Sequence, residues 1–183
     1  MREEPVKLVA LLRGINVGNG PRVSMKDLTA VLEKAGARNV VTYLNSGNAV
    51  FEGAGDPARW SASIERAIER GLGQTVPVVV KKGMEVCAIA DSIPKSWKGD
   101  ETQQTYVVYL PDDVASPRII GELPVKHQYV TFRYAHNAII WNIKKADFNR
   151  SQITRISAHP AYGRMTIRNV NTARKLADLC RDG

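Results

Sequence analysis

The stretch Val40-Val41-Thr42-Tyr43-Leu44-Asn45-Ser46-Gly47-Asn48-Ala49-Val50-Phe51 decides how the first half of this chain folds. Two runs of β-branched and aromatic residues flank a polar segment that contains a glycine, which is the pattern of a β-hairpin. We therefore expect strands at residues 40–44 and 49–52, joined by a turn at 45–48.

Elements on either side of this hairpin complete a longer pattern. An apolar run at residues 7–12 predicts a buried first strand. Ser24 with Asp27 three residues later predicts a capped helix start, and Asp56 predicts the start of a second helix. A further strand is expected at residues 76–80. The resulting order, βαββαβ, is that of the ferredoxin-like fold, for which we expect the sheet order 4-1-3-2.

The second half repeats this pattern more weakly. It predicts a strand at 104–110, a short helix at 113–121, a hairpin of 128–133 with 138–143, and helices near 146–156 and 168–180. Residues 41–43 and 48–50 match 130–132 and 137–139 without gaps, at a constant offset of 89. Such a match favours a duplication, although hairpins share composition and convergence is the alternative. We expect an α+β protein with a ferredoxin-like βαββαβ domain at 1–82 and a degenerate α/β subdomain at 83–183.

The charge of the chain is concentrated at its C-terminal end. Of the formal net charge of +8, residues 144–183 carry +6. A basic segment favours an anionic partner, either nucleic acid or a phosphorylated small molecule. The alternative is a solvated basic surface that promotes solubility.

Composition sets several expectations about compartment and chemistry. No apolar run approaches the ~20 residues of a membrane-spanning helix, and the acidic start Met1-Arg2-Glu3-Glu4-Pro5 does not resemble a signal peptide. Only Cys87 and Cys180 are present, which fits buried thiols in a reducing cytoplasm. The three histidines are not clustered, so we expect no metal site and no cofactor.

Two glycine- and asparagine-rich segments follow predicted strands: Arg13-Gly14-Ile15-Asn16-Val17-Gly18-Asn19-Gly20 and Asn45-Ser46-Gly47-Asn48. In the expected sheet order they meet at one edge, beside the helix start at Ser24. Backbone N–H groups there, with the Arg13 and Arg22 side chains, would bind an anion. The alternative is that glycines supply positive φ and asparagines bond their own backbone, with no ligand involved.

A third motif, Thr166-Ile167-Arg168-Asn169-Val170-Asn171-Thr172, follows a pattern of the form Thr-x-Arg-Asn-Trp-Asn-Thr. With the 11–18 and 45–48 segments, it makes the chain similar to the mainly bacterial family called domain of unknown function 1697. Val170 replaces the usual Trp, and Asn45 stands where Gln is common. The resemblance implies a compact α/β protein without an established activity. It draws attention to Arg168, Asn169 and Asn171, which we expect on a helix that begins near Thr166, with helix capping as the alternative role.

The function expected from these observations is binding of a phosphate-bearing ligand or a nucleic-acid backbone. The candidate ligand-binding residues are Arg13, Gly14, Asn16, Gly18, Arg22, Asn45, Ser46, Gly47, Asn48, Arg168, Asn169 and Asn171. One alternative is an enzyme that uses Ser46 as nucleophile, although no histidine has an evident reason to lie beside it. Another is a protein-interaction module. The sequence does not settle whether a reaction is catalysed, nor the oligomeric state.

Overall fold

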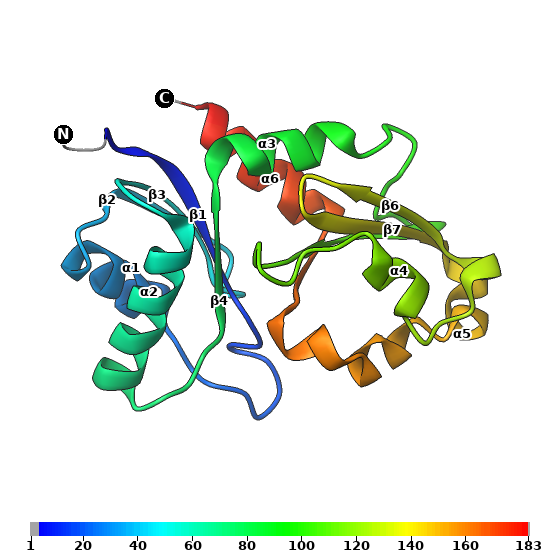
Figure 1. Cartoon of the computed structure of the whole chain (residues 1–183), viewed down its shortest axis with the longest axis horizontal. Coiled ribbons are helices and arrows are strands. Elements are labelled where there is room, and N and C mark those ends of the chain that lie inside the picture. The colour runs from blue at the N-terminus through cyan, green and yellow to red at the C-terminus, as the bar shows by residue number, and fades with distance from the viewer. Residues whose placement is uncertain (1–3, 183) are drawn as a thin grey trace. The chain divides into compact units, whose positions relative to one another are not determined.

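Two four-stranded antiparallel sheets form the computed structural model, which describes residues 4–182 (Figure 1). Met1, Arg2 and Glu3, on which the signal-peptide expectation partly rests, lie outside the described residues. In chain order the helices and strands are β1 (Val6–Leu12), α1 (Met25–Lys34), β2 (Arg38–Tyr43), β3 (Asn48–Gly53), α2 (Pro57–Leu72), β4 (Val78–Lys82), α3 (Gly83–Ser92), β5 (Gln103–Tyr109), α4 (Arg118–Glu122), β6 (Thr131–Ala135), β7 (Ala138–Lys144), α5 (Phe148–Ser151), β8 (Thr166–Asn169) and α6 (Val170–Arg181).

The first sheet has the order β2-β3-β1-β4, so the expected order 4-1-3-2 is confirmed. Strand β1 pairs antiparallel with β3, with Leu11 opposite Asn48, and antiparallel with β4 on its other side. Helices α1 and α2 cover one face of this sheet (Figure 1). Alternate residues of β1, among them Leu8 and Leu12, form the core there with Leu32 of α1 and Ile64 of α2.

Local signals in the sequence place the helix ends of this half correctly. The Ser24 hydroxyl accepts a hydrogen bond from the Asp27 N–H and donates one to the Asp27 carboxylate, so Ser24 is the N-cap of α1. The Asp56 carboxylate caps α2 by accepting from the Ala58 N–H. Helix α2 ends at Gly73 in the left-handed conformation, which glycine adopts without steric penalty.

The second sheet, β6-β7-β5-β8, repeats the strand order of the first. On one face of this sheet, alternate residues of β5 and β7, such as Val108, Ile139 and Trp141, form a core cluster with Ile119 of α4. Two similar halves with the same order fit a duplicated fold.

The gap-free alignment of the two hairpins at offset 89 is wrong in register. Ala49 and Phe51 belong to the core of the first half, whereas Ile139 and Trp141 belong to the core of the second, so the core positions of β3 and β7 differ by an even number. An odd offset moves every side chain to the opposite face of the sheet. The two turns also differ in length, since β2 and β3 are joined by residues 44–47 and β6 and β7 by His136 and Asn137 alone, both at positive φ. No single offset therefore aligns both strands of the two hairpins.

Three helices expected in the second half differ from those in the structure. The helix expected at 113–121 is confined to α4, because residues 111–115 form a turn and Pro117 precedes the helix. The helix expected at 146–156 is broken into α5 and short 3-10 turns, since Gln152 lies at φ +53° between them. The segment Thr166–Asn169 is strand β8, because it completes the sheet by pairing with β5, and the last helix begins only at Val170.

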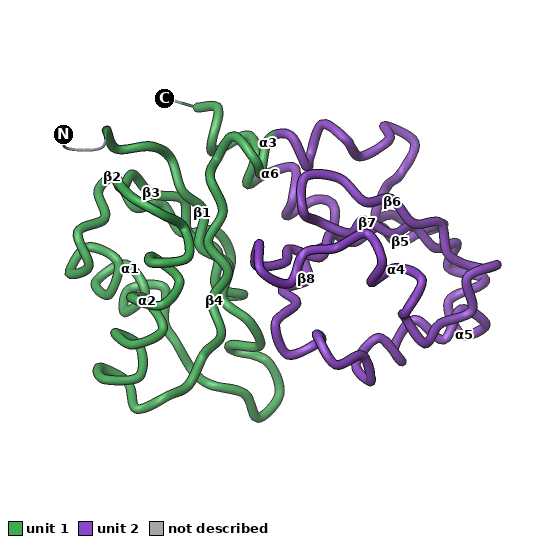
Figure 2. The backbone as a smooth tube through the Cα atoms, in the orientation of Figure 1, with its two compact units in different colours: residues 1–87, 176–183 green, residues 88–175 purple. Residues whose placement is uncertain are grey.

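The chain divides into two compact units (Figure 2). Unit 1 contains residues 1–87 and 176–183, and unit 2 contains residues 88–175. The chain leaves unit 1 within α3, a helix that the sequence patterns did not predict, and re-enters it within α6. The division into domains at residue 82 stays a prediction. Among residues 4–182, every helix is too short or too polar to cross a bilayer.

Candidate functional site

The two polar segments of unit 1 meet at one edge of its sheet, as the topology predicts. The Asn16 Nδ2 group donates hydrogen bonds to the Val23 and Asn45 carbonyl oxygens, each at 2.7 Å. Its Oδ1 atom accepts from the Val23 N–H at 3.0 Å. The Leu12 N–H donates to the Gly47 carbonyl oxygen at 2.8 Å. Asn16 therefore joins the start and end of its own loop to the β2–β3 turn.

The turn itself is packed tightly against the loop. Gly47 lies at φ +82°, and a Cβ atom at this position would lie 2.7 Å from Leu12 Cβ and 2.8 Å from Ile15 Cδ1. Asn48 is buried, and its side-chain amide donates to the Tyr43 carbonyl oxygen and the Ser46 hydroxyl. The amides of Asn16 and Asn48 are thus engaged in holding the loops, which is the structural role considered as the alternative to ligand binding.

Along residues 13–19 the backbone φ angle is positive at every second residue. Gly14, Asn16 and Gly18 lie at φ +67°, +57° and +50°, and each residue between them lies outside the positive-φ region. Such alternation is the backbone pattern of a nest, a concave loop whose successive N–H groups can face an anion. Within the part of the chain that the structure describes, the N–H groups of Gly14, Gly18 and Asn19 have no hydrogen-bond acceptor. All three residues are exposed, so these donors are available to solvent or a ligand.

Positive charge is added to this loop by Arg22. Its guanidinium donates to the Gly18 carbonyl oxygen at 2.8 Å, which holds it beside the nest, and the side chain is exposed. Arg13 is half-buried, and its N–H donates to the Pro77 carbonyl oxygen. The α1 N-terminus contributes less than expected to an anion site, because the Asp27 carboxylate already supplies a negative charge in its first turn.

The nucleophile considered in the sequence, Ser46, lies in the turn and accepts a hydrogen bond from Asn48. Unit 1 contains no histidine in its sequence, since the three histidines are at positions 127, 136 and 159. The unit therefore offers Ser46 no imidazole general base of its own.

The third motif belongs to unit 2 and is divided between β8 and α6. Arg168 is on β8 rather than on a helix, so it shares no helix face with Asn171. Burial lowers the pKa of the Arg168 guanidinium to about 10, and a Coulombic interaction with Tyr109 opposes this shift. The Asn169 Oδ1 atom accepts from the Thr172 N–H at 2.9 Å, so Asn169 caps α6.

Asn169 and Asn171 line a cavity of about 440 Å³ in unit 2 that the sequence did not predict. Gln104 and Tyr106 at the start of β5 and Lys145 after β7 line it as well. These residues are separated by up to 67 positions, and no local pattern marks them as neighbours. Among the described residues, no group of three or more His, Cys, Asp or Glu side chains could hold a metal ion.

The loops at 11–18 and 45–48 lie within the segment, residues 6–141, that matches the sequence profile described as "Protein of unknown function (DUF1697)". The chain belongs to the DUF1697 family. The third motif lies beyond the matched segment. The comparison with curated proteins found no match.

One solved structure supports the fold of this DUF1697 chain. The conserved bacterial protein SP0830 from Streptococcus pneumoniae is 20% identical and has a TM-score of 0.82, with 96% of this chain and 99% of that one covered. Protein BT0572 from Bacteroides thetaiotaomicron is 11% identical over 94% and 98% of the two chains, with a TM-score of 0.23. The first similarity shows that the fold recurs at low sequence identity.

Proposed function

We propose that this DUF1697 protein binds a phosphate-bearing ligand at the nest formed by residues 13–19. The alternation of positive φ at Gly14, Asn16 and Gly18 carries the proposal, because it is the backbone pattern of an anion-binding nest and both glycines are exposed. Arg22, held beside the nest through the Gly18 carbonyl, supplies a guanidinium for a charge-assisted hydrogen bond.

The asparagine network supports the proposal by keeping the nest rigid. Asn16 ties the loop to the β2–β3 turn, so little conformational entropy is lost when a ligand binds. The exposed Asn45 side chain lies on the adjoining turn, where it can orient the ligand. A contribution of Arg168, Asn169 and Asn171 to the same ligand stays a prediction. We retain a cytoplasmic location in this proposal because both cysteines are free thiols.

Phosphate binding is tested by ¹H–¹⁵N NMR titration of the full chain with inorganic phosphate and with adenosine triphosphate. We expect the amide signals of Gly14, Gly18 and Asn19 to shift together and to saturate. Arg22→Ala removes a charge-assisted contact worth about 1.5–3 kcal/mol, so affinity should fall by roughly 10- to 100-fold. Arg59→Ala, which removes an exposed arginine from α2, is the matched control and should bind like the wild type.

Nucleic acid is a second candidate ligand, because its backbone carries many phosphate groups. A fluorescent single-stranded oligonucleotide should lose affinity by orders of magnitude between 50 and 200 mM salt if the backbone of nucleic acid is bound through several phosphates. If oligonucleotide affinity does not change with salt, but inorganic phosphate still shifts the nest amide signals, the ligand is a small molecule. Unshifted nest amides with every probe would refute the proposed site.

A further inference from the structure

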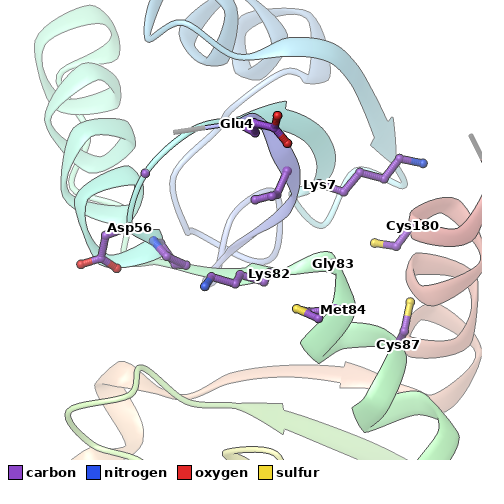
Figure 3. A pocket seen from close by; sticks show the side chains of 11 residues that line it. Glu4, Lys7, Asp56, Lys82, Gly83, Met84, Cys87 and Cys180 are labelled. Atoms are coloured by element: carbon purple, nitrogen blue, oxygen red, sulfur yellow. The ribbon is translucent and has the colours of Figure 1, made fainter. Parts of the chain in front are cut away.

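Unit 1 has a cavity of about 780 Å³ that is bordered by two cysteines (Figure 3). Cys87 projects from α3 and Cys180 from α6, and both are half-buried free thiols. Lys7 and Lys82 also line this cavity. Both cysteines therefore border a space that a small molecule can enter.

Each sulfur atom lies against the helix that carries the other cysteine. The Cys87 thiol donates to the Ala177 carbonyl oxygen at 3.5 Å, and Ala177 is three residues before Cys180, on the same side of α6. The Cys180 sulfur lies 3.3 Å from the place a Cβ of Gly83 would take, and Gly83 is four residues before Cys87 on α3. The missing Gly83 side chain lets the two helices approach at this point.

The ionisation of the Cys180 thiol depends on its surroundings, including Cys87. Burial raises the pKa of Cys180 to about 12, and both the charge of Cys87 and a side-chain hydrogen bond with it act in the same direction. Lys7 on β1 and Arg181 on α6 lower the pKa of Cys180 but do not compensate. The Cys180 thiolate is therefore scarce near neutral pH, so we assign the first nucleophilic attack to Cys87.

We propose that Cys87 and Cys180 form a redox pair that closes to an intramolecular disulfide by exchange with a low-molecular-weight disulfide in this cavity. The Cys87 thiolate attacks one sulfur of the small disulfide, forms a mixed disulfide and releases one small thiolate. The Cys180 thiolate then attacks the Cys87 sulfur, breaks the mixed disulfide and releases the second small thiolate. The two cysteine protons end on the two released thiols, and the small disulfide takes up the two electrons.

Closure would enclose the whole of unit 2 in a covalent loop. All of residues 88–175 lie between Cys87 and Cys180 in the sequence, while both cysteines belong to unit 1. A cross-link across so long a segment restricts the unfolded chain strongly. The oxidised protein should therefore unfold at a higher temperature than the reduced protein.

The experiment treats the reduced full chain with 2-hydroxyethyl disulfide at pH 7, 8 and 9, followed by acid quenching and intact mass spectrometry. Once the reaction is complete, the wild type should have lost two hydrogens and keep no adduct, and a mixed disulfide on Cys87 should precede this form. Cys180→Ser should keep one adduct, on Cys87. Peptide mapping should find residues 87 and 180 linked.

Several results would contradict the proposal that Cys87 and Cys180 form a redox pair. One is a wild type that keeps adducts on both cysteines at pH 9; another is an oxidised wild type that migrates as a disulfide-linked dimer on a non-reducing gel. Because Cys180→Ser can fail to fold, thermal unfolding of reduced and oxidised wild type gives a second measurement. An unchanged midpoint after complete loss of free thiols would also contradict the intramolecular bond.

Discussion

The Asn16 side chain donates a hydrogen bond to the Asn45 carbonyl oxygen at 2.7 Å, across 29 residues of sequence. The same amide nitrogen also donates to Val23, and the Oδ1 atom accepts from the Val23 N–H. One side chain thus closes its own loop and fastens it to the β2–β3 turn. The backbone of Asn16 is itself in the left-handed conformation that asparagine tolerates better than most residues.

Replacing Asn16 should therefore destabilise unit 1. Asn16→Ala removes three hydrogen bonds and places alanine at φ +57°, so we expect a loss of about 2–4 kcal/mol in the free energy of unfolding. Urea denaturation followed by circular dichroism measures it. Asn39→Ala is the control, because Asn39 lies at φ +52° with an exposed side chain, and only the backbone cost of about 1 kcal/mol is expected. Equal losses in both variants would contradict the role of the network.

The packing of the turn predicts that Gly47 does not tolerate a side chain. Gly47→Ala combines a positive φ with a Cβ atom that contacts the Leu12 and Ile15 side chains, so we expect a loss of about 2–4 kcal/mol. Gly36→Ala has a φ of +99° but open space around the new Cβ atom, and it should cost only about 1 kcal/mol. The midpoints of thermal unfolding should rank in this order, and the reverse order would show that the turn rearranges to accept alanine.

Two asparagines of the third motif should contribute differently to stability, because Asn169 caps α6 and Asn171 is exposed. Asn169→Ala removes the side-chain acceptor for the Thr172 N–H at the start of α6, which should cost about 1 kcal/mol. Asn171→Ala removes an exposed amide one position into the helix and should change stability by less than about 0.5 kcal/mol. Chemical denaturation of both variants measures the difference. A neutral Asn169→Ala would show that the cap is dispensable.

The ion pair between Arg164 and Asp113 predicts a pH effect in unit 2. Arg164 donates from two nitrogens, at 2.6 and 3.0 Å, and its hydrogen bond lowers the pKa of the Asp113 carboxyl below the ordinary value. Because the folded-state pKa is depressed, any stabilisation is present above the ordinary value and is lost as pH falls through the depressed one. Arg164→Ala should return the Asp113 pKa toward its usual range, as measured by NMR titration of the carboxyl carbon. Arg118→Ala, at another exposed arginine of unit 2, should leave it unchanged.

Much of the first half could be predicted because its signals act over a few residues. Ser24 with Asp27 and Asp56 with Ala58 cap helices through contacts two or three positions apart, and these starts were correct. The expected sheet order also brought the two polar loops together, which the Asn16–Asn45 hydrogen bond confirms. The role of Asn16 in this contact was not foreseen, because its partners lie 7 and 29 residues away.

The second half was predicted less well because its elements depend on distant partners. Strand β8 has only four residues, and it is a strand because Thr166 pairs with Tyr109 at its start and Asn169 with Tyr106 at its end. Without that pairing the segment resembles the first turn of the following helix. Similarly, the left-handed Gln152 breaks a helical pattern that the sequence itself continues.

By itself, the sequence determined the order of elements in the first half, the ends of its helices and the polar segments that end its strands. These features follow from hydrogen bonds and side-chain periodicity within a few residues. Only the tertiary structure decided the register of the second hairpin, the pairing of β8, the nest at residues 13–19 and the approach of Cys87 to Cys180. Each of these depends on backbone conformations or contacts that form only when distant segments pack together and exclude water.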